Sequence, residues 1–214
     1  GNVGEKAPRL LTPRETILEQ DRTLTLEDKG DNGKYYVYVK GDVVYTTDQV
    51  ADAITKANEK MGVVVGADQE YIWKRSRNAI RPALSDIAVG AEDVSSGSIA
   101  QCINAMLEKE GINISVSALI AGGETPKNIL SNTMKDARIL DLTGCSVEEV
   151  LYYVSCGNPV FAMTGSNEAV LVVGYDANNV IIFDPSSESN FKQSITEADE
   201  VFKAAGNVFF TYLK

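Results

Sequence analysis

The chemistry open to this chain is limited first by a missing side chain. Its 214 residues include no histidine and three cysteines, Cys102, Cys145 and Cys156. Without imidazole there is no Ser-His-Asp triad, no Cys-His dyad and no zinc site of the usual histidine type. The cysteines are odd in number and lack metal-type spacing, so they indicate neither a zinc ribbon nor a disulfide framework. We expect no metal and no cofactor.

Each cysteine has a structural interpretation. Cys102 falls on the apolar stripe of a predicted helix, where a cysteine behaves as a small buried hydrophobe. Cys145 and Cys156 flank another predicted helix, whose rise separates them by about 16 Å, beyond disulfide reach. We therefore expect core packing at Cys102 and no bond between the other two.

The charge balance excludes some classes of partner. Asp and Glu number 30 against 20 Lys and Arg, which gives a net charge of −10. Nucleic acids and anionic membrane surfaces need a basic patch, so we expect neither as a partner. The basic cluster consists of Lys74, Arg75, Arg77 and Arg81, which we interpret as a solvated rim. No apolar run approaches the ~20 residues of a membrane span, so a membrane would be reached only through segments outside this chain.

The first part of the chain predicts an arm and a small module. Residues 1–30 are polar and are interpreted as a linker or arm. Residues 31–76 form a predicted ββαββ accessory module with strands over 35–39, 43–46, 63–65 and 71–73 and a helix over 50–61. Asp48 is positioned to cap this helix and Gly62 to end it.

Tyrosines are concentrated in this module. Strand alternation puts Tyr36 and Tyr38 on one face and Tyr35 with Val37 and Val39 on the other. One face can be core while the other exposes an aromatic surface. Two interpretations stay open: cross-strand packing, or a platform that binds peptide or glycan.

Residues 85–214 predict a larger unit in which helices come first and strands last. The helices are predicted over 98–110, 116–121, 126–134 and 147–156, and the strands over 159–163, 169–175, 180–183 and 208–213, with one more helix from 196. This order is typical of an α+β fold with a mainly antiparallel sheet. Three pairs predict helix caps: Ser98 with Gln101, Ser146 with Glu149, and Thr196 with Asp199.

The helix order and three strand motifs of residues 85–214 resemble the papain-like cysteine peptidase superfamily. They are most similar to its bacteriocin-processing branch, which cleaves double-glycine leaders. The motifs are Gly-x-Pro-Val at 157–160, Gly-Tyr-Asp at 174–176 and Asp-Pro at 184–185. The resemblance implies a papain-like fold for this unit.

The resemblance also implies where a catalytic site would lie. The family's nucleophilic cysteine, at the start of the first helix, corresponds to Ser98. Its histidine, at the start of the Gly-Tyr-Asp strand, corresponds to Glu168, and its orienting aspartate to Asp184. The family's oxyanion glutamine has no counterpart, because residues 91–97 contain no Gln. The catalytic Cys and His are thus replaced.

Two functional readings follow. A pseudo-peptidase would bind a peptide or partner protein, or act as a structural part of a larger protein at a bacterial cell surface. The alternative is an active hydrolase that uses Ser98 with Glu168 and Asp184, or a histidine supplied by a partner. Each residue also has a plain interpretation: Ser98 as a helix cap, Glu168 as a solvent-facing residue, and Asp184 as a turn residue that caps backbone N–H groups.

Overall fold

The computed structural model describes residues 33–88, 96–187 and 189–214, so the predicted arm 1–30 lies outside the described residues. The chain divides into two compact units, 1–75 and 76–214. The N-terminal unit contains β1 (Tyr35–Val39), β2 (Asp42–Thr47), α2 (Val50–Lys60), β3 (Val63–Gly66) and β4 (Tyr71–Trp73). Its antiparallel sheet has the order β2-β1-β3-β4, and these elements are the predicted ββαββ set.

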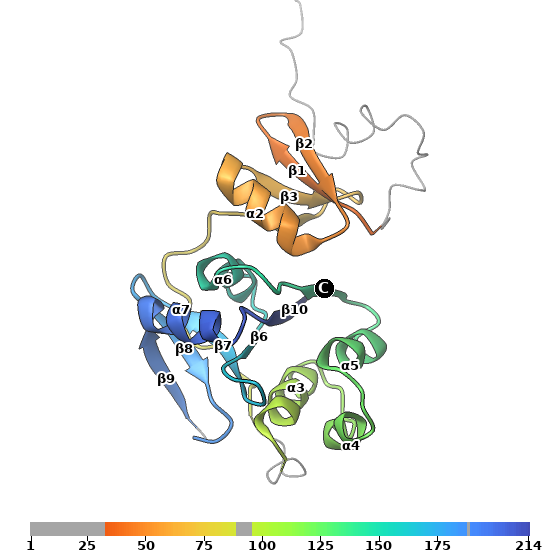
Figure 1. Ribbon diagram of the computed structural model, residues 1–214, viewed down its shortest axis with the longest axis vertical. Coiled ribbons are helices and arrows are strands. Elements are labelled where there is room, and N and C mark those ends of the chain that lie inside the picture. Colours follow the sequence, from red (N-terminus) through yellow and green to blue (C-terminus); the bar gives the residue numbers. More distant parts are fainter. Residues whose placement is uncertain (1–32, 89–95, 188) are drawn as a thin grey trace, which may run out of the picture. The chain divides into compact units, whose positions relative to one another are not determined.

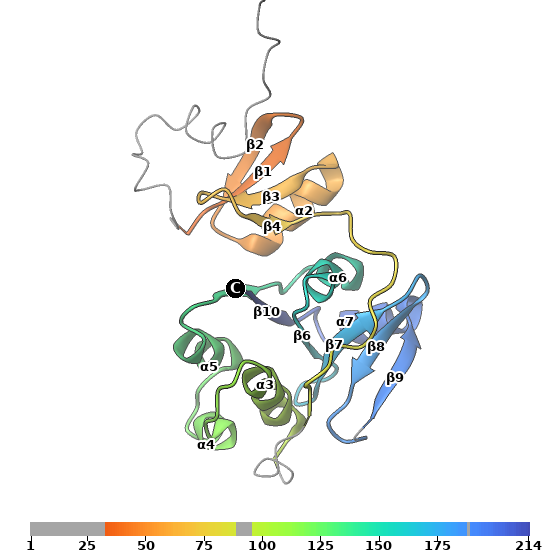
Figure 2. The same ribbon diagram turned by 180° about the vertical axis from the view of Figure 1, so that it is seen from behind.

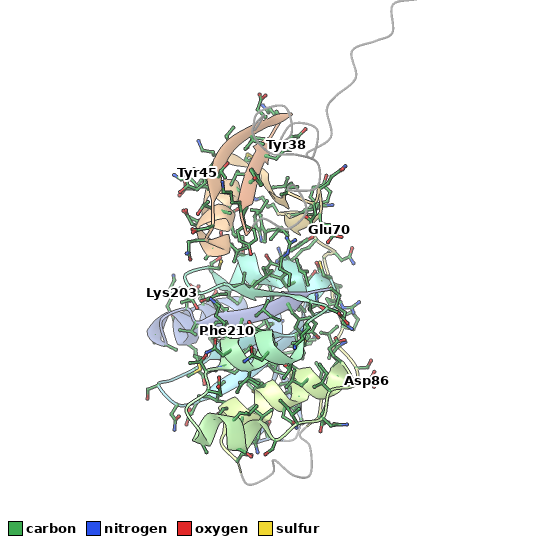
Figure 3. The ribbon with its side chains drawn as sticks, turned by 90° about the vertical axis from the view of Figure 1, so that its right-hand side faces the viewer. Tyr38, Tyr45, Glu70, Asp86, Lys203 and Phe210 are labelled. Atoms are coloured by element: carbon green, nitrogen blue, oxygen red, sulfur yellow. The ribbon has the colours of Figure 1, made fainter. Side chains whose placement is uncertain are left out.

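Both faces of this small sheet carry apolar side chains. On one face the Tyr45 hydroxyl donates to Asp52 of α2 at 2.6 Å. The other face holds a cluster built on Tyr36 and Val65, with Tyr38 packed against it; Figure 3 labels Tyr38 and Tyr45. The predicted alternation is confirmed. Because Tyr36 is only 4% exposed, its ring is a packing residue.

The caps of α2 differ from the prediction. Gln49, and not Asp48, is the N-cap residue, and its side chain makes no capping hydrogen bond. At the other end Met61 takes the left-handed conformation, with φ of 58°. Gly62 is needed for a different reason: a Cβ there would lie 2.7 Å from the carbonyl oxygen of Tyr38. Close approach of the backbone to β1 thus explains this glycine.

The C-terminal unit has the predicted α+β architecture. Its elements are α3 (Ser98–Lys109), α4 (Val116–Ala121), α5 (Pro126–Thr133), β5 (Arg138–Asp141), α6 (Val147–Ser155), β6 (Val160–Met163), β7 (Ala169–Tyr175), β8 (Asn179–Phe183), β9 (Asn190–Ser194), α7 (Ile195–Ala204) and β10 (Phe209–Leu213). The six strands form an antiparallel sheet of order β5-β10-β6-β7-β8-β9. The two edge strands, β5 and β9, were not predicted.

Helices cover both faces of this sheet (Figure 1, Figure 2). On one face α3 packs on β7 and is itself flanked by α4 and α5. Cys102 and Met106 of α3 share a buried cluster there with Leu171 of β7. On the other face lie α6 and α7, where the rings of Phe202 and Phe209 meet at 5.3 Å. The first turn of α3 is therefore held against the start of β7.

The predicted caps had different outcomes. Ser146 and Glu149 form the predicted capping box, in which Glu149 accepts from the Ser146 N–H at 2.8 Å and Ser146 accepts from the Glu149 N–H at 3.2 Å. The prediction of Thr196 with Asp199 is wrong. The N-cap residue of α7 is Ser194, two residues before Thr196. Its hydroxyl accepts a hydrogen bond from the Glu197 N–H at 3.1 Å.

Candidate functional site

Ser98 lies at the start of α3, but it does not cap that helix. The N-cap residue is Gly97, and no side chain makes a capping hydrogen bond. The Ser98 hydroxyl instead accepts a hydrogen bond from the backbone N–H of Ala169 at 3.0 Å. The predicted capping box with Gln101 is therefore wrong, because the hydroxyl is engaged by β7.

This hydrogen bond brings two predicted site positions together. Ala169 is the first residue of β7 and directly follows Glu168, whose carbonyl oxygen closes the β6–β7 turn by accepting from the Thr164 N–H at 2.9 Å. Glu168 itself is exposed. Ser98 thus lies one residue along the backbone from the position that the resemblance assigns to a catalytic histidine.

The surroundings of Ser98 contain a donor but no base. Its one polar partner in the described residues is the Ala169 N–H, which can stabilise negative charge on the hydroxyl oxygen but cannot accept its proton. The Glu168 carboxylate is exposed and makes no hydrogen bond or ion pair within the described ranges. A general base must come within about 2.6–3.2 Å of the proton that it removes. The described geometry supplies none at Ser98.

Asp184 follows β8 and is engaged by its own turn. Its Oδ1 atom accepts from the Ser186 N–H at 2.9 Å and from the Ser186 hydroxyl at 2.7 Å. Its carbonyl oxygen accepts from the Ser187 N–H at 3.1 Å. This is the turn arrangement that the plain interpretation of Asp-Pro predicted.

Cys102 does not replace the missing nucleophile. It is fully buried one turn into α3. Burial raises the pKa of its thiol, and the negative charge of Asp184 raises it further. The reactive form of cysteine is the thiolate, so this side chain is a packing residue, as predicted.

The other two cysteines are free as well. Cys145 is buried and Cys156 is exposed, so the prediction that they are not bonded to each other is confirmed. Burial, followed by the charges of Glu149 and Asp141, raises the pKa of the Cys145 thiol. Within the described ranges, no group of three or more His, Cys, Asp or Glu side chains is arranged to hold a metal ion.

The Gly-Tyr-Asp motif has a structural purpose at each residue. A Cβ at Gly174 would lie 2.8 Å from the carbonyl oxygen of Arg81, so only glycine lets the chain cross here. The Tyr175 ring is 1% exposed, and its hydroxyl donates to the carbonyl oxygen of Asn78 at 2.7 Å. Asp176 caps the β7–β8 turn by accepting from two backbone N–H groups at 3.0 and 2.9 Å. Hydrogen bonds from those groups and from a lysine lower the pKa of Asp176 to about 2.

The basic cluster is only in part the solvated rim that was predicted. Arg75 is exposed, and Lys74 lies 3.8 Å from the centre of the Tyr71 ring. Arg77 and Arg81, however, are half-buried in the C-terminal unit. They lie beside β7 because residues 77–84 pack along this strand.

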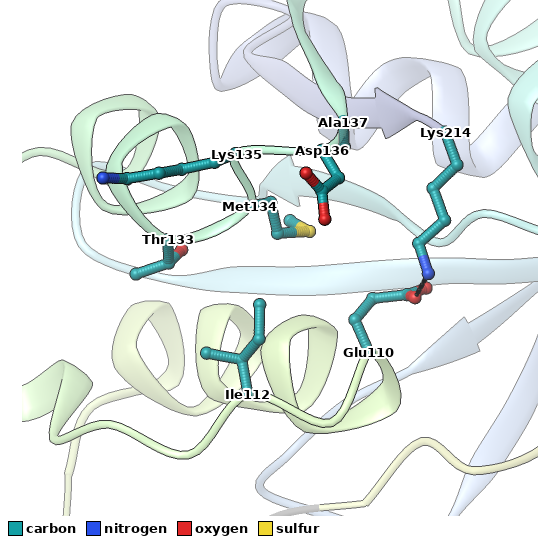
Figure 4. Close-up of a pocket in the computed structure, with 8 residues that line it drawn as sticks. All are labelled: Glu110, Ile112, Thr133, Met134, Lys135, Asp136, Ala137 and Lys214. Carbon is teal, nitrogen blue, oxygen red and sulfur yellow. Dashed lines mark ion pairs between the residues drawn. The ribbon is translucent and has the colours of Figure 1, made fainter.

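A cavity of about 290 Å³ lies at the other end of α3 (Figure 4). Glu110 lines it, accepts a hydrogen bond from the Tyr212 hydroxyl at 2.6 Å and pairs with Lys214. Burial acts to raise the pKa of Glu110, but the Lys214 and Tyr212 hydrogen bonds outweigh it and lower that pKa. The apolar part of the wall includes Ile112 and Met134. This cavity is separated from Ser98 by the whole length of α3.

No protein-family model matches the sequence, and no curated protein matches it. The chain is similar to a solved structure of a Bacillus anthracis protein described as a candidate C39-like peptidase, with a TM-score of 0.49 and 17% sequence identity. The match covers 68% of this chain and 98% of that chain. Function must therefore be argued from the residues of the site. In the described part of the chain, no helix is long and apolar enough to cross a membrane.

Proposed function

We propose that residues 76–214 form a peptidase-like domain without catalytic activity, which binds an extended peptide or a partner protein where α3 meets β7. The hydrogen bond between Ser98 and the Ala169 N–H carries the proposal. It supports close approach of the two positions that a papain-like peptidase gives to its nucleophile and its histidine, because Ala169 directly follows Glu168. This contact favours a site that keeps the arrangement of a peptidase site without its catalytic side chains.

The absence of catalysis is supported by the partners of the three candidate residues. Ser98 has a hydrogen-bond donor as its neighbour, and the exposed Glu168 carboxylate has no hydrogen-bond or ion-pair partner among the residues that the structure describes. One carboxylate oxygen of Asp184 already accepts hydrogen bonds from the Ser186 N–H and the Ser186 hydroxyl. A serine hydroxyl without a positioned base stays protonated near neutral pH.

Activity is tested directly on the full chain. We expect no casein hydrolysis and no fluorophosphonate labelling from about pH 3 to about pH 8, a range that spans carboxylate titration. Labelling that disappears in Ser98→Ala would overturn the proposal and support the active hydrolase with Glu168 and Asp184. Hydrolysis that appears only after a histidine-bearing partner is added would also overturn it.

A restoration experiment tests the geometry of the site. In the double variant S98C/E168H a thiol at the start of α3 faces an imidazole at the start of β7, and both the imidazolium and the helix dipole favour the thiolate. We expect iodoacetamide to alkylate this variant about tenfold faster than S98C at pH 6, after allowance for the lower nucleophilicity of a low-pKa thiolate.

The matched control places the histidine one residue away. S98C/N167H introduces the same imidazole at an exposed position of the same turn. It should react like S98C alone. Equal rates for S98C/E168H and S98C/N167H would show that positions 98 and 168 do not form a paired site.

Binding is tested with a library of extended peptides and the wild-type chain. Ser98→Tyr should block the junction of α3 and β7 and weaken any binder by about tenfold or more. The control is Ser115→Tyr, at the exposed start of α4. If no peptide binds, or if both variants bind equally well, the peptide-binding proposal fails and a purely structural role is favoured.

A further inference from the structure

Residues 77–84 cross β7 at the end opposite Ala169, so this region is distinct from the Ser98 site. The Arg81 N–H donates to the Tyr175 carbonyl at 2.8 Å, and the Tyr175 N–H donates to the Arg81 carbonyl at 2.9 Å. Because the two residues exchange both backbone hydrogen bonds, as paired residues of an antiparallel sheet do, the backbone from which the Arg81 side chain extends is fixed. The long side chain therefore starts from a fixed point on the sheet.

Arg77 and Arg81 are both neighbours of the buried residue Tyr175. The Cζ atom of Arg77 lies 5.0 Å from the ring centroid. An Nη2 atom of Arg81 lies 3.8 Å from where a Cβ of Gly157 would be, just past the end of α6. Burial raises the pKa of the Tyr175 hydroxyl, and the charges of Arg77 and Arg81 both act against that rise. Both cations are thus within electrostatic range of one hydroxyl.

Neither arginine has a carboxylate partner in the described part of the chain. None of the ion pairs between described residues uses Arg77 or Arg81. The Nε atoms of Arg77 and Arg81 are both buried without a hydrogen-bond partner, although each side chain is partly open to solvent. Partly buried charges are normally paired, because desolvation of an unpaired charge is costly. In a chain with 30 acidic residues, two half-buried arginines with no carboxylate partner among residues 33–88, 96–187 and 189–214 are unusual.

We propose that Arg77 and Arg81 form a binding site for a single oxyanion group, such as a carboxylate, sulfate or phosphate. A guanidinium presents a planar fork of N–H donors that matches two oxygens of such a group. A bound oxyanion would offset two like charges that have no carboxylate partner in the described residues. The site is independent of catalysis and of peptide binding at Ser98.

The end of α6 offers a competing explanation. A helix C-terminus carries partial negative charge, which stabilises a nearby cation. Arg81 could have this role alone, and Arg81→Gln would then destabilise the unit whether or not an anion is present. Dependence on the anion therefore distinguishes the two explanations.

The first test follows the arginine side chains of the wild-type chain by NMR. Sodium sulfate is titrated against sodium chloride at constant ionic strength, and the Nε–Hε signals are recorded. We expect the Arg77 and Arg81 signals to shift with saturation, at a half-point of about 10 mM or lower, while that of the exposed Arg75 does not. Shifts that rise linearly with sulfate concentration, or that are equal for all arginines, would indicate general charge screening and overturn the proposal.

The second test measures thermal unfolding in the same solutions. A saturating anion should raise the Tm of the wild type and of Arg75→Gln by about 3 °C, and that of R77Q/R81Q not at all. Equal rises in all three proteins would indicate the general stabilising effect of sulfate and overturn the proposal. Parallel titrations with acetate and phosphate identify the source: a response to acetate favours a carboxylate ligand, and a response to phosphate and sulfate alone favours a tetrahedral one.

Discussion

The two ends of α3 hold their polar groups in opposite ways. At the C-terminal end, Glu110 accepts from the Tyr212 hydroxyl and pairs with Lys214, so charge and hydrogen bonds are matched. At the N-terminal end, Ser98 has one backbone partner, the Ala169 N–H. The end with an oriented carboxylate is thus opposite the end that carries Ser98.

The difference shows what a catalytic site requires beyond residue types. Electrostatic catalysis depends on groups that are already oriented before the reaction. Glu110 is oriented by its neighbours, whereas Glu168 is solvated and not hydrogen-bonded in the described residues. A carboxylate close to a serine is therefore insufficient, and the following variants test how far this contrast holds.

The largest effect is expected at Glu110. Glu110→Ala leaves the Tyr212 hydroxyl, in a side chain with no exposed surface, without its acceptor and removes the partner of Lys214. We expect a loss of about 2–3 kcal/mol in the free energy of unfolding by urea. Glu108→Ala, an exposed carboxylate on the same helix, should cost less than about 0.5 kcal/mol. Equal losses for the two variants would remove the contrast.

The pH dependence of Glu110 sharpens the same comparison. Its pKa is lowered in the folded state, so its contribution to stability is complete above its unfolded pKa of about 4.3 and is lost as pH falls through the folded value. We expect the wild type to lose more stability than Glu110→Gln as pH falls from about 5 to about 3. Parallel urea-unfolding curves for the two proteins across this range would contradict the prediction.

A smaller effect is expected at Ser98. Ser98→Ala removes the acceptor of the Ala169 N–H, which should cost about 1 kcal/mol and speed hydrogen exchange at that amide. Ser115 also lies at a helix start and makes no capping hydrogen bond, so Ser115→Ala is the control and should change little. If exchange at Ala169 stays unchanged, the hydrogen bond does not hold α3 to β7.

The smallest effect is expected at Glu168. Because its side chain is exposed, Glu168→Gln should change the free energy of unfolding by no more than about 0.5 kcal/mol at any pH from about 4 to 8. Urea unfolding at several pH values measures this. A loss above about 1 kcal/mol would mean that the carboxylate has a bound partner, and the contrast between the ends of α3 would be weaker than described.

Local patterns predicted the fold where the determining partners are local. The Ser146–Glu149 capping box is confirmed because both partners lie within one helical turn. The equivalent pattern at Ser98 failed because its hydroxyl bonds to a residue 71 positions away. Strand β9 was missed for a related reason: as an edge strand it is mostly exposed and polar, so its sequence carries no apolar alternation.

The candidate site was only partly predictable. Its residues could be proposed through the resemblance, but whether Ser98 meets a donor or an acceptor depends on how the turn before β7 is placed. The surroundings of Arg77 and Arg81 could not be predicted, because they depend on the path of residues 77–84 over Tyr175. Contacts between distant segments decide both.

The crossing of β7 by residues 77–84 also bears on how the C-terminal unit could be produced alone. A fragment that starts at residue 85, where the predicted larger unit begins, would lose the two backbone hydrogen bonds between Arg81 and Tyr175 and the 2.9 Å bond from the Leu84 N–H to the Val173 carbonyl. The shorter fragment would expose both the edge of β7 and the ring of Tyr175, and exposed strand edges and apolar surfaces promote self-association. A fragment that starts at residue 76 keeps residues 77–84 and is the better choice for expression.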